Sequence, residues 1–325
     1  MEGHYGLSVA ALAFLPVGND AASWVYRLET GEGQRYFLKL RSKARFNAPS
    51  LIVPRYLLEQ ELPHILAPLP TREQELWVAL EDFMLTVYPF VEGRMAAHVG
   101  LSAAQWQAFG ALVRRVHDCR LPRDLRQQLP VETFVPGQRD LIAALQQASA
   151  RQRLDDEVRR EFADFWREQQ EIIDVLVTRA GALGTELRRA RAPRVLCHAD
   201  MHPWNVLVAE DGEFWLIDWD EVVMALRERD LMFVVGGLRV DDGVAAARTA
   251  QFLQGYGDVK LNPTALAYYR YARAVEDIAA DGDRVFFAPD LGEVSRRAAL
   301  EGFKSMFATG NIVSMALASP LSGHN

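Results

Sequence analysis

Cysteine and membrane-type apolar runs are both scarce in this chain. Only Cys119 and Cys197 occur among its 325 residues, too few for the disulfide framework of a small secreted domain. The opening segment MEGHYGLSVA lacks the charged and apolar regions of a signal peptide. No apolar run reaches the roughly 18 residues that would suggest a transmembrane helix. We therefore expect a cytoplasmic protein without a membrane span.

The chain also lacks a dense run of Lys and Arg, and its formal net charge is −7. Extended nucleic-acid surfaces neutralise phosphates with clustered cations, so we do not expect a nucleic-acid partner. An acidic protein attracts small cationic ligands more readily. Half of the residues are hydrophobic, which is enough to bury a sizeable core, and the length favours two lobes over one.

The first third of the chain favours antiparallel strands. Two hairpins are predicted, one turning at residues 30–33 and the other at residues 81–82. Their strands cover residues 24–28, 36–40, 76–80 and 83–88, and a short helix is expected at 50–60.

Helical spacing begins near residue 100. Ser102 and Gln105 form a predicted capping box, and an apolar stripe marks a long helix within 154–191. Asn262 and Pro263 suit the cap and first position of a further helix. We place the boundary at residues 88–92, which gives an N-terminal sheet lobe (1–92) and a larger, mainly helical lobe (93–325), an α+β fold.

The most informative segment is VLCHADMHPWNVLVAEDGEFWLIDWDEVVMALRERD, residues 195–230. Asp211 and Gly212 lie between two short apolar strands and favour a two-residue type I′ turn. With that loop, Asn205 would face Asp218 across the open end of the hairpin, within about 5 Å at Cβ. Magnesium needs only one or two such oxygen ligands from the protein when it also binds phosphate oxygens. Asp200 precedes Asn205 by five positions and could accept a proton from a substrate hydroxyl.

Phosphoryl transfer needs positioned phosphates, a bridging metal and an acceptor for the hydroxyl proton. Lys39 interrupts an apolar strand pattern and is a candidate to contact the phosphates. An equally acceptable interpretation is a surface lysine that protects an edge strand. The acids at 218, 220 and 221 could be a solvated turn, although the register favours a functional role for Asp218; for the other two we favour a supporting role. Trp204, Trp215 and Trp219 are expected to pack in the core.

A metallohydrolase is a competing interpretation, because His198, Asp200 and His202 are potential zinc or iron ligands. The only histidine after His202 is His324, so downstream imidazole ligands are missing. His202 more simply orients the loop.

HADMHPWN followed by LIDWD resembles the H-x-D-x-x-x-x-N and I-D signatures of the aminoglycoside phosphotransferase and choline kinase group, which has a protein-kinase-like fold. The resemblance implies an ATP- and Mg²⁺-dependent enzyme with Asp200 as catalytic base and Asn205 and Asp218 as metal ligands. It also implies that Lys39 contacts the nucleotide phosphates. His198 and Asp230 would support the catalytic loop.

The same resemblance places adenine against the backbone of residues 88–91. Pro89 keeps its carbonyl but has no N–H, so it would accept from the adenine amino group while the N–H of Val91 donates. Asp20 and Ser23 would lie in the loop over the phosphates, although this loop is poor in glycine. The family's helix glutamate, which pairs with the strand lysine, has no equivalent near residue 50. Glu59 is the nearest substitute.

The stretches IDWDEVVMALRERDLMFV and YYRYARAVEDIA resemble those of spectinomycin phosphotransferases. The resemblance implies O-phosphorylation of a cationic aminocyclitol or aminoglycoside such as spectinomycin. The residues expected to share the polar, substrate-binding face of the last helix are Tyr269, Arg273, Glu276 and Asp277. An amphipathic helix with a merely solvated face is the alternative. Kinases of choline, an amino sugar or homoserine, and a catalytically silent nucleotide-binding module, remain open.

Overall fold

The computed structural model describes residues 1–16, 22–151, 154, 156–235, 242–289 and 291–319. Its contacts group into two compact units. The first comprises Met1–Pro130, Leu196–Met224 and Gln251–Gly257, and the second comprises Val131–Val195, Ala225–Ala250 and Asp258–Asn325. The predicted boundary at residues 88–92 lies inside the first unit, so the division into 1–92 and 93–325 stays a prediction.

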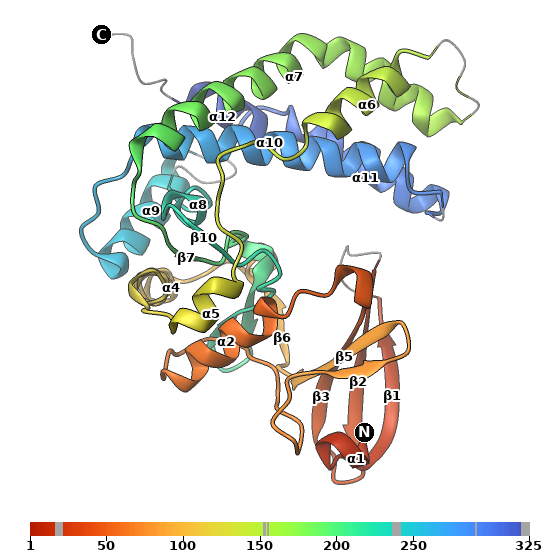
Figure 1. Ribbon diagram of the computed structural model, residues 1–325, viewed down its shortest axis with the longest axis vertical. Helices are drawn as coiled ribbons and strands as arrows, with labels where there is room; N and C mark the ends of the chain where they lie inside the picture. The colour runs from red at the N-terminus through yellow and green to blue at the C-terminus, as the bar shows by residue number, and fades with distance from the viewer. Residues whose placement is uncertain (17–21, 152–153, 155, 236–241, 290, 320–325) are drawn as a thin grey trace. The chain divides into compact units, whose positions relative to one another are not determined.

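A five-stranded antiparallel sheet dominates the N-terminal third of the chain (Figure 1). Its strand order is β1-β2-β3-β5-β4. The strands are β1 (Val9–Leu15), β2 (Ser23–Thr30), β3 (Arg35–Ser42), β4 (Val78–Leu80) and β5 (Phe83–Pro89). Both predicted hairpins are confirmed. Because β3 lies between β2 and β5, the interpretation of Lys39 as an edge-strand lysine is wrong.

One face of this sheet forms a small apolar core of alternate residues, including Leu28, Leu38 and Val87. Helix α1 (Glu2–Tyr5) precedes the sheet, and Tyr5 packs on that core. After β3 follow a 3₁₀ turn, η1 (Lys43–Arg45), and the predicted helix, α2 (Pro49–Glu59). Pro54 lies within α2, which continues through it.

The rest of the first unit is built around a second, three-stranded sheet of order β6-β8-β9. Its strands are β6 (Gly93–Met95), β8 (Val206–Ala209) and β9 (Phe214–Leu216). The helices nearby in sequence are α3 (Ala96–Val99), α4 (Ala103–Asp118), α5 (Arg123–Gln128) and the 3₁₀ turn η2 (Pro203–Asn205). The capping box of Ser102 and Gln105 begins α4 as predicted. Strands β7 (Val195–Cys197) and β10 (Val223–Ala225) form a two-stranded sheet.

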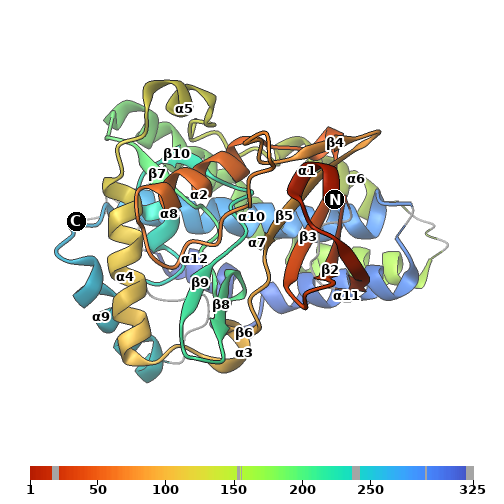
Figure 2. The same ribbon diagram turned by 90° about the horizontal axis from the view of Figure 1, so that it is seen from below.

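Helix α9 (Asp242–Tyr256) crosses α4 at very short range, and both views show its C-terminal end beside α4 (Figures 1 and 2). A Cβ atom added to Gly110 of α4 would lie 2.0 Å from the carbonyl oxygen of Phe252. One added to Gly255 of α9 would lie 1.7 Å from the carbonyl oxygen of Gln107. Glycine is therefore required at both positions because the two backbones touch.

The second unit is helical. It contains α6 (Arg139–Ser149), α7 (Glu157–Ala190), α8 (Glu228–Leu231), α10 (Pro263–Phe286), α11 (Glu293–Met306) and α12 (Ile312–Ala318). The long helices α7, α10 and α11 lie side by side (Figure 1), with Phe162 and Phe303 stacked at 4.2 Å between ring centroids. Asn262 caps α10 by accepting the N–H of Ala265, as predicted. Among the helices of the described residues, none combines the length and apolar character needed to cross a membrane.

Gly110→Ala tests the helix crossing. The added methyl group would meet the backbone of α9, which cannot be relieved by a rotamer change. We expect a loss of about 3 kcal/mol in the free energy of unfolding, despite the helix propensity of alanine. Gly31→Ala is the control, since no atom lies within 4 Å of its added Cβ. Chemical denaturation of both variants measures the difference, and equal stabilities would contradict the close crossing.

Candidate functional site

The β8–β9 hairpin turns through three residues. The N–H of Ala209 donates to the carbonyl of Glu213 at 2.8 Å, and Gly212 has a left-handed φ of 87°, as in a type I turn followed by a bulge. Val206 therefore pairs with Leu216, and Ile217 donates to the carbonyl of Asn205 at 3.0 Å. The predicted two-residue turn, with Asn205 opposite Asp218, is wrong by one position.

Asp218 follows this hairpin in a strained backbone conformation. Its φ of 61° is uncommon for a residue with a side chain, although aspartate tolerates it better than most. Such outliers concentrate at functional sites. The turn in the backbone redirects the side chain after the strand ends, and Oδ1 of Asp218 lies 3.8 Å from Nζ of Lys39.

His198 connects the loop of residues 198–205, which carries Asp200, to Ile217, the residue after β9. This histidine is fully buried, and its Nε2 lies 3.0 Å from the carbonyl oxygen of Ile217. Its Nδ1 accepts the backbone N–H of Asp200 at 3.3 Å. Since Nδ1 accepts, the hydrogen-bond pattern assigns the proton to Nε2. A neutral imidazole thus links the loop to the hairpin, which supports the predicted bracing role.

Asp200 and Asn205 meet directly. Nδ2 of Asn205 donates to the backbone carbonyl of Asp200 at 2.8 Å and to its Oδ2 at 2.9 Å. Nε2 of His202 lies 3.3 Å from the same carboxylate oxygen. Because both amide contacts use the nitrogen, the carbonyl oxygen of Asn205 faces elsewhere, which suits a cation ligand.

Lys39 contacts two aspartates. Its Nζ lies 3.1 Å from Oδ2 of Asp220 and 3.8 Å from Oδ1 of Asp218. Arg41, on the same face of β3, makes a bidentate contact with Asp220: Nη1 lies 2.7 Å from Oδ1 and Nη2 lies 2.5 Å from Oδ2. Nδ2 of Asn47 donates to the backbone carbonyl of Asp220 at 3.1 Å. Asp220 was predicted as a supporting residue, but Arg41 and Asn47 were not predicted at all.

The two aspartates titrate in opposite directions. Loss of solvent around the carboxyl group raises the pKa of Asp218 to about 7, and the charges of Asp220 and Asp200 add to this against the attraction of Lys39. Burial alone would raise the pKa of Asp220 too, but Lys39 and Arg41 outweigh it and hold that pKa below its usual range. Lys39 and Arg41 therefore compensate the charge of Asp220 more fully than that of Asp218.

This charge distribution suits a hard divalent cation. Asn205 and Asp218 offer neutral and anionic oxygen donors, the ligand types that magnesium prefers. A bound cation would favour the ionised form of Asp218 and so oppose the shift that raises its pKa. The assignment of Asn205 and Asp218 as metal ligands stays a prediction.

Glu59 does not meet Lys39. Its carboxylate pairs with Arg55 at 2.7 Å, one turn earlier on the exposed side of α2. Lys39 pairs instead with Asp220 and Asp218. The expectation that Glu59 replaces the missing helix glutamate is therefore corrected.

The predicted nucleotide segments lie around β3. Pro89 ends β5 opposite Tyr36 of β3, and Val91 follows in the link to β6. Ser23 begins β2 opposite Arg41, next to the predicted phosphate loop. Asp20 lies outside the described residues.

The predicted substrate helix is α10, and only part of its expected polar face is open. Tyr269 is fully buried, and its hydroxyl accepts the N–H of Leu226 at 3.2 Å, so its placement on the polar face is wrong. Arg273 pairs with Asp277 at 2.8 Å. Glu276 pairs with the buried Arg229 at 3.3 Å. The side chains of Glu276 and Asp277 remain partly exposed, at 37% and 31% respectively.

Two tryptophans near the site differ in exposure, and a predicted supporting aspartate is buried. Trp204 is 54% exposed, whereas Trp219 is buried as predicted; the expectation of core packing is thus wrong for Trp204. Its ring meets the ring of His98 edge-on, with 4.6 Å between centroids. Asp230 is fully buried on α8.

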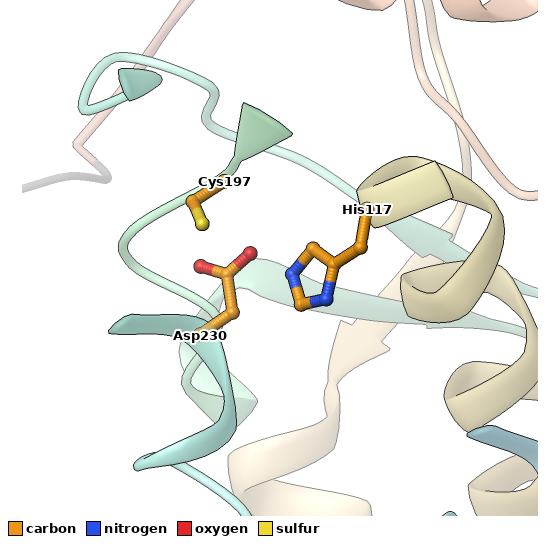
Figure 3. A group of neighbouring side chains, drawn as sticks. All are labelled: His117, Cys197 and Asp230. Carbon is orange, nitrogen blue, oxygen red and sulfur yellow. The ribbon is translucent and has the colours of Figure 1, made fainter. Parts of the chain in front are cut away.

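The interior of the first unit holds a histidine and a cysteine in close contact. His117 of α4 and Cys197 at the end of β7 point toward each other (Figure 3) and offer ligand-type atoms within 4.8 Å. Nδ1 of His117 also lies 2.8 Å from the hydroxyl of Tyr256. Both side chains are buried, and they contribute to core packing beside the loop that follows β7.

A strand lysine, an Asp–Asn loop and an aspartate after a hairpin define the class of phosphotransferases with a kinase-like α+β fold. The comparisons with known proteins agree. The model of the family described as "Phosphotransferase enzyme family" matches residues 13–270. The chain belongs to this family and is an aminoglycoside-type, small-molecule phosphotransferase.

Solved structures extend the similarity over nearly the whole chain. Spectinomycin phosphotransferase APH(9)-Ia, in complex with ADP and spectinomycin, is 30% identical, with a TM-score of 0.88 over 98% of this chain and 95% of that chain. Amicoumacin kinase hAmiN, in complex with AMP-PNP and Ca²⁺, is 18% identical, with a TM-score of 0.64 over 96% and 92%, which shows the fold alone. The curated protein StrN of Streptomyces griseus is 26% identical over 255 residues, 75% of this chain and 74% of StrN.

One turn beyond Asp277, α10 buries a carboxyl group that was not predicted. Asp281 is 6% exposed, and a Cβ on Gly302 of α11 would lie 2.6 Å from its Oδ2. Burial, with a contribution from Asp277, raises the pKa of Asp281 to about 6, although Arg284 opposes the shift.

This shift predicts a pH dependence of stability. The folded pKa exceeds the unfolded value of about 3.9, so the folded state holds its proton more tightly. The contribution of Asp281 to stability is therefore full below about pH 4, falls as pH rises to about 6, and stays constant above. Asp281→Asn removes this pH-dependent decrease in the free energy of unfolding, which amounts to about 3 kcal/mol at most. The melting temperature of the variant minus that of the wild type should be more positive at pH 7.5 than at pH 4.5. A difference that does not change with pH would contradict a buried, protonated carboxyl group.

Proposed function

We propose that this protein transfers the γ-phosphoryl group of ATP to a hydroxyl of a cationic aminocyclitol such as spectinomycin. The observation that carries the proposal is the similarity to a spectinomycin phosphotransferase solved with ADP and spectinomycin, at 30% identity over 98% of this chain. Choline kinase LicA from Streptococcus pneumoniae shares the fold at only 15% identity and a TM-score of 0.57, so it gives no comparable support for choline.

Asp200 acts as the general base in this proposal. It accepts the proton of the acceptor hydroxyl, a contribution of roughly 10²–10⁴-fold in rate for a positioned base. Asn205 and His202 contact one oxygen of its carboxylate and so restrict its rotation. His198 donates to the carbonyl of Ile217 and holds the loop in this position.

The nucleotide is held by residues around β3. Lys39 contacts the α- and β-phosphates, Ser23 and Asp20 contribute to the loop above them, and the carbonyl of Pro89 and the N–H of Val91 bind adenine. Asn205 and Asp218 would hold magnesium, which would neutralise negative charge on the transferring phosphates.

The acceptor amines are recognised by carboxylates of α10. Glu276 and Asp277 are partly exposed and already paired with Arg229 and Arg273. An ammonium group of the acceptor would share these carboxylates with the arginines. The ring of Tyr269 lies 5.7 Å from the guanidinium carbon of Arg229, and supports that arginine from the core.

Product formation tests the proposal directly. The protein is incubated with γ-labelled ATP, magnesium and spectinomycin, and mass measurement follows. We expect spectinomycin to gain one phosphoryl group. Parallel reactions contain choline, homoserine or an amino sugar. A product only in one of these would replace spectinomycin as the acceptor, and magnesium-dependent ATP binding without any product would indicate a catalytically silent module.

Asp200→Asn tests the base. The variant keeps an oxygen that can accept from Asn205, so we expect ADP affinity within about twofold of wild type. Turnover should fall roughly 10²–10⁴-fold, because an amide cannot accept the proton. Asp124→Asn, on the exposed side of α5, is the matched control. Turnover close to the wild-type rate would remove Asp200 from this role.

A further inference from the structure

The strand lysine of this chain has no glutamate partner on α2. Glu59, the nearest acid expected there, is paired with Arg55. Lys39 is nevertheless held, because its side chain is only 21% exposed and its Nζ lies 3.1 Å from Oδ2 of Asp220. Asp220 lies 181 positions after Lys39 in the sequence. It follows the proposed metal ligand Asp218 by two residues.

Asp220 is fixed from three directions. Arg41 lies two positions from Lys39 on β3, so both side chains point to the same face of the sheet. Its guanidinium group contacts both oxygens of the Asp220 carboxylate, a geometry that restricts rotation as well as adding attraction. Asn47 holds the backbone carbonyl of Asp220 from the turn after β3.

Lys39 lies closer to Asp220 than to Asp218. Asp218 lies only 3.8 Å from Lys39, whereas the carboxylate of Asp220 is also paired with Arg41. Without Asp220, the attraction between unlike charges would draw Lys39 onto Asp218. The lysine would then leave the phosphates and compete with magnesium for its carboxylate ligand.

We propose that Asp220, held by Arg41 and Asn47, is the positioning residue for Lys39 and replaces the helix glutamate that this chain lacks. The inference rests on the proposed contact of Lys39 with the nucleotide phosphates. It does not depend on the identity of the acceptor.

A double-mutant cycle on nucleotide binding tests the inference. The affinity for ADP with Mg²⁺ is measured by calorimetry for wild type, Asp220→Asn, Lys39→Met and the double variant, with no acceptor present. Asp220→Asn should raise the Kd for ADP about tenfold, equivalent to about 1.4 kcal/mol, because Lys39 loses a charged hydrogen-bond partner. In the Lys39→Met background the same change should alter the Kd by less than about twofold, because positioning residues are non-additive with the group they position.

Asp118→Asn is the matched control. It breaks an exposed Arg–Asp pair, in which Nε of Arg114 lies 2.6 Å from Oδ2 of Asp118 on α4, and should leave the Kd for ADP unchanged. Thermal unfolding of each variant checks that it is folded. If Asp220→Asn does not fold, Arg41→Lys serves instead, since it keeps the charge but loses the bidentate contact; it should weaken ADP binding in the same non-additive way.

Three results would overturn the inference. An unchanged or lower Kd in Asp220→Asn would show that Lys39 needs no partner. An equal loss of affinity in both backgrounds would show that Asp220 acts independently of Lys39, as a metal ligand or a structural tether. If Lys39→Met alone leaves the Kd unchanged, the proposed role of the lysine fails first, and with it the inference. None of these three results bears on whether spectinomycin is the acceptor, because no acceptor is present in the binding measurement.

Discussion

Both backbone groups of Ile217 are used to hold the site. Its N–H donates to the carbonyl of Asn205, and its carbonyl lies 3.0 Å from Nε2 of His198. One residue at the end of β9 therefore fixes both ends of the loop that carries Asp200. Main-chain contacts of this kind do not depend on the acceptor or nucleotide, so the proposed base and the metal-ligand asparagine are positioned before either binds. Preorganised groups lose little free energy to rearrangement during a reaction.

The charges at this position are divided unequally, and that division gives each aspartate a different role. Asp220 is compensated by Lys39 and Arg41, whereas Asp218 is crowded by other carboxylates. A divalent cation would stabilise the charge of Asp218 and would gain little from Asp220, whose charge is already compensated. Two acids only two residues apart thus serve different proposed functions, one toward the metal and one toward the lysine.

The errors in the sequence-based predictions have specific physical causes. Asp211 and Gly212 suit a two-residue turn and a three-residue turn equally well, and one extra residue in the loop shifts every cross-strand partner by one. Tyr269 shares a helical period with exposed residues, but a phenol ring can turn toward the core when its hydroxyl finds a partner, here the N–H of Leu226. Trp204 was assigned to the core by residue type, yet it is 54% exposed.

The sequence by itself determined the two hairpins β2–β3 and β4–β5 and the capped starts of α4 and α10, because these follow from local spacing and from side-chain chemistry; on the same grounds it predicted the Asp–Asn–Asp set. Only the tertiary structure decided the register of the β8–β9 hairpin, the burial of Tyr269 and the partner of Lys39. Asp220 lies 181 positions from that lysine, and no local pattern specifies a contact across such a distance. That contact forms only when β3 and the segment after β9 are brought together by the fold.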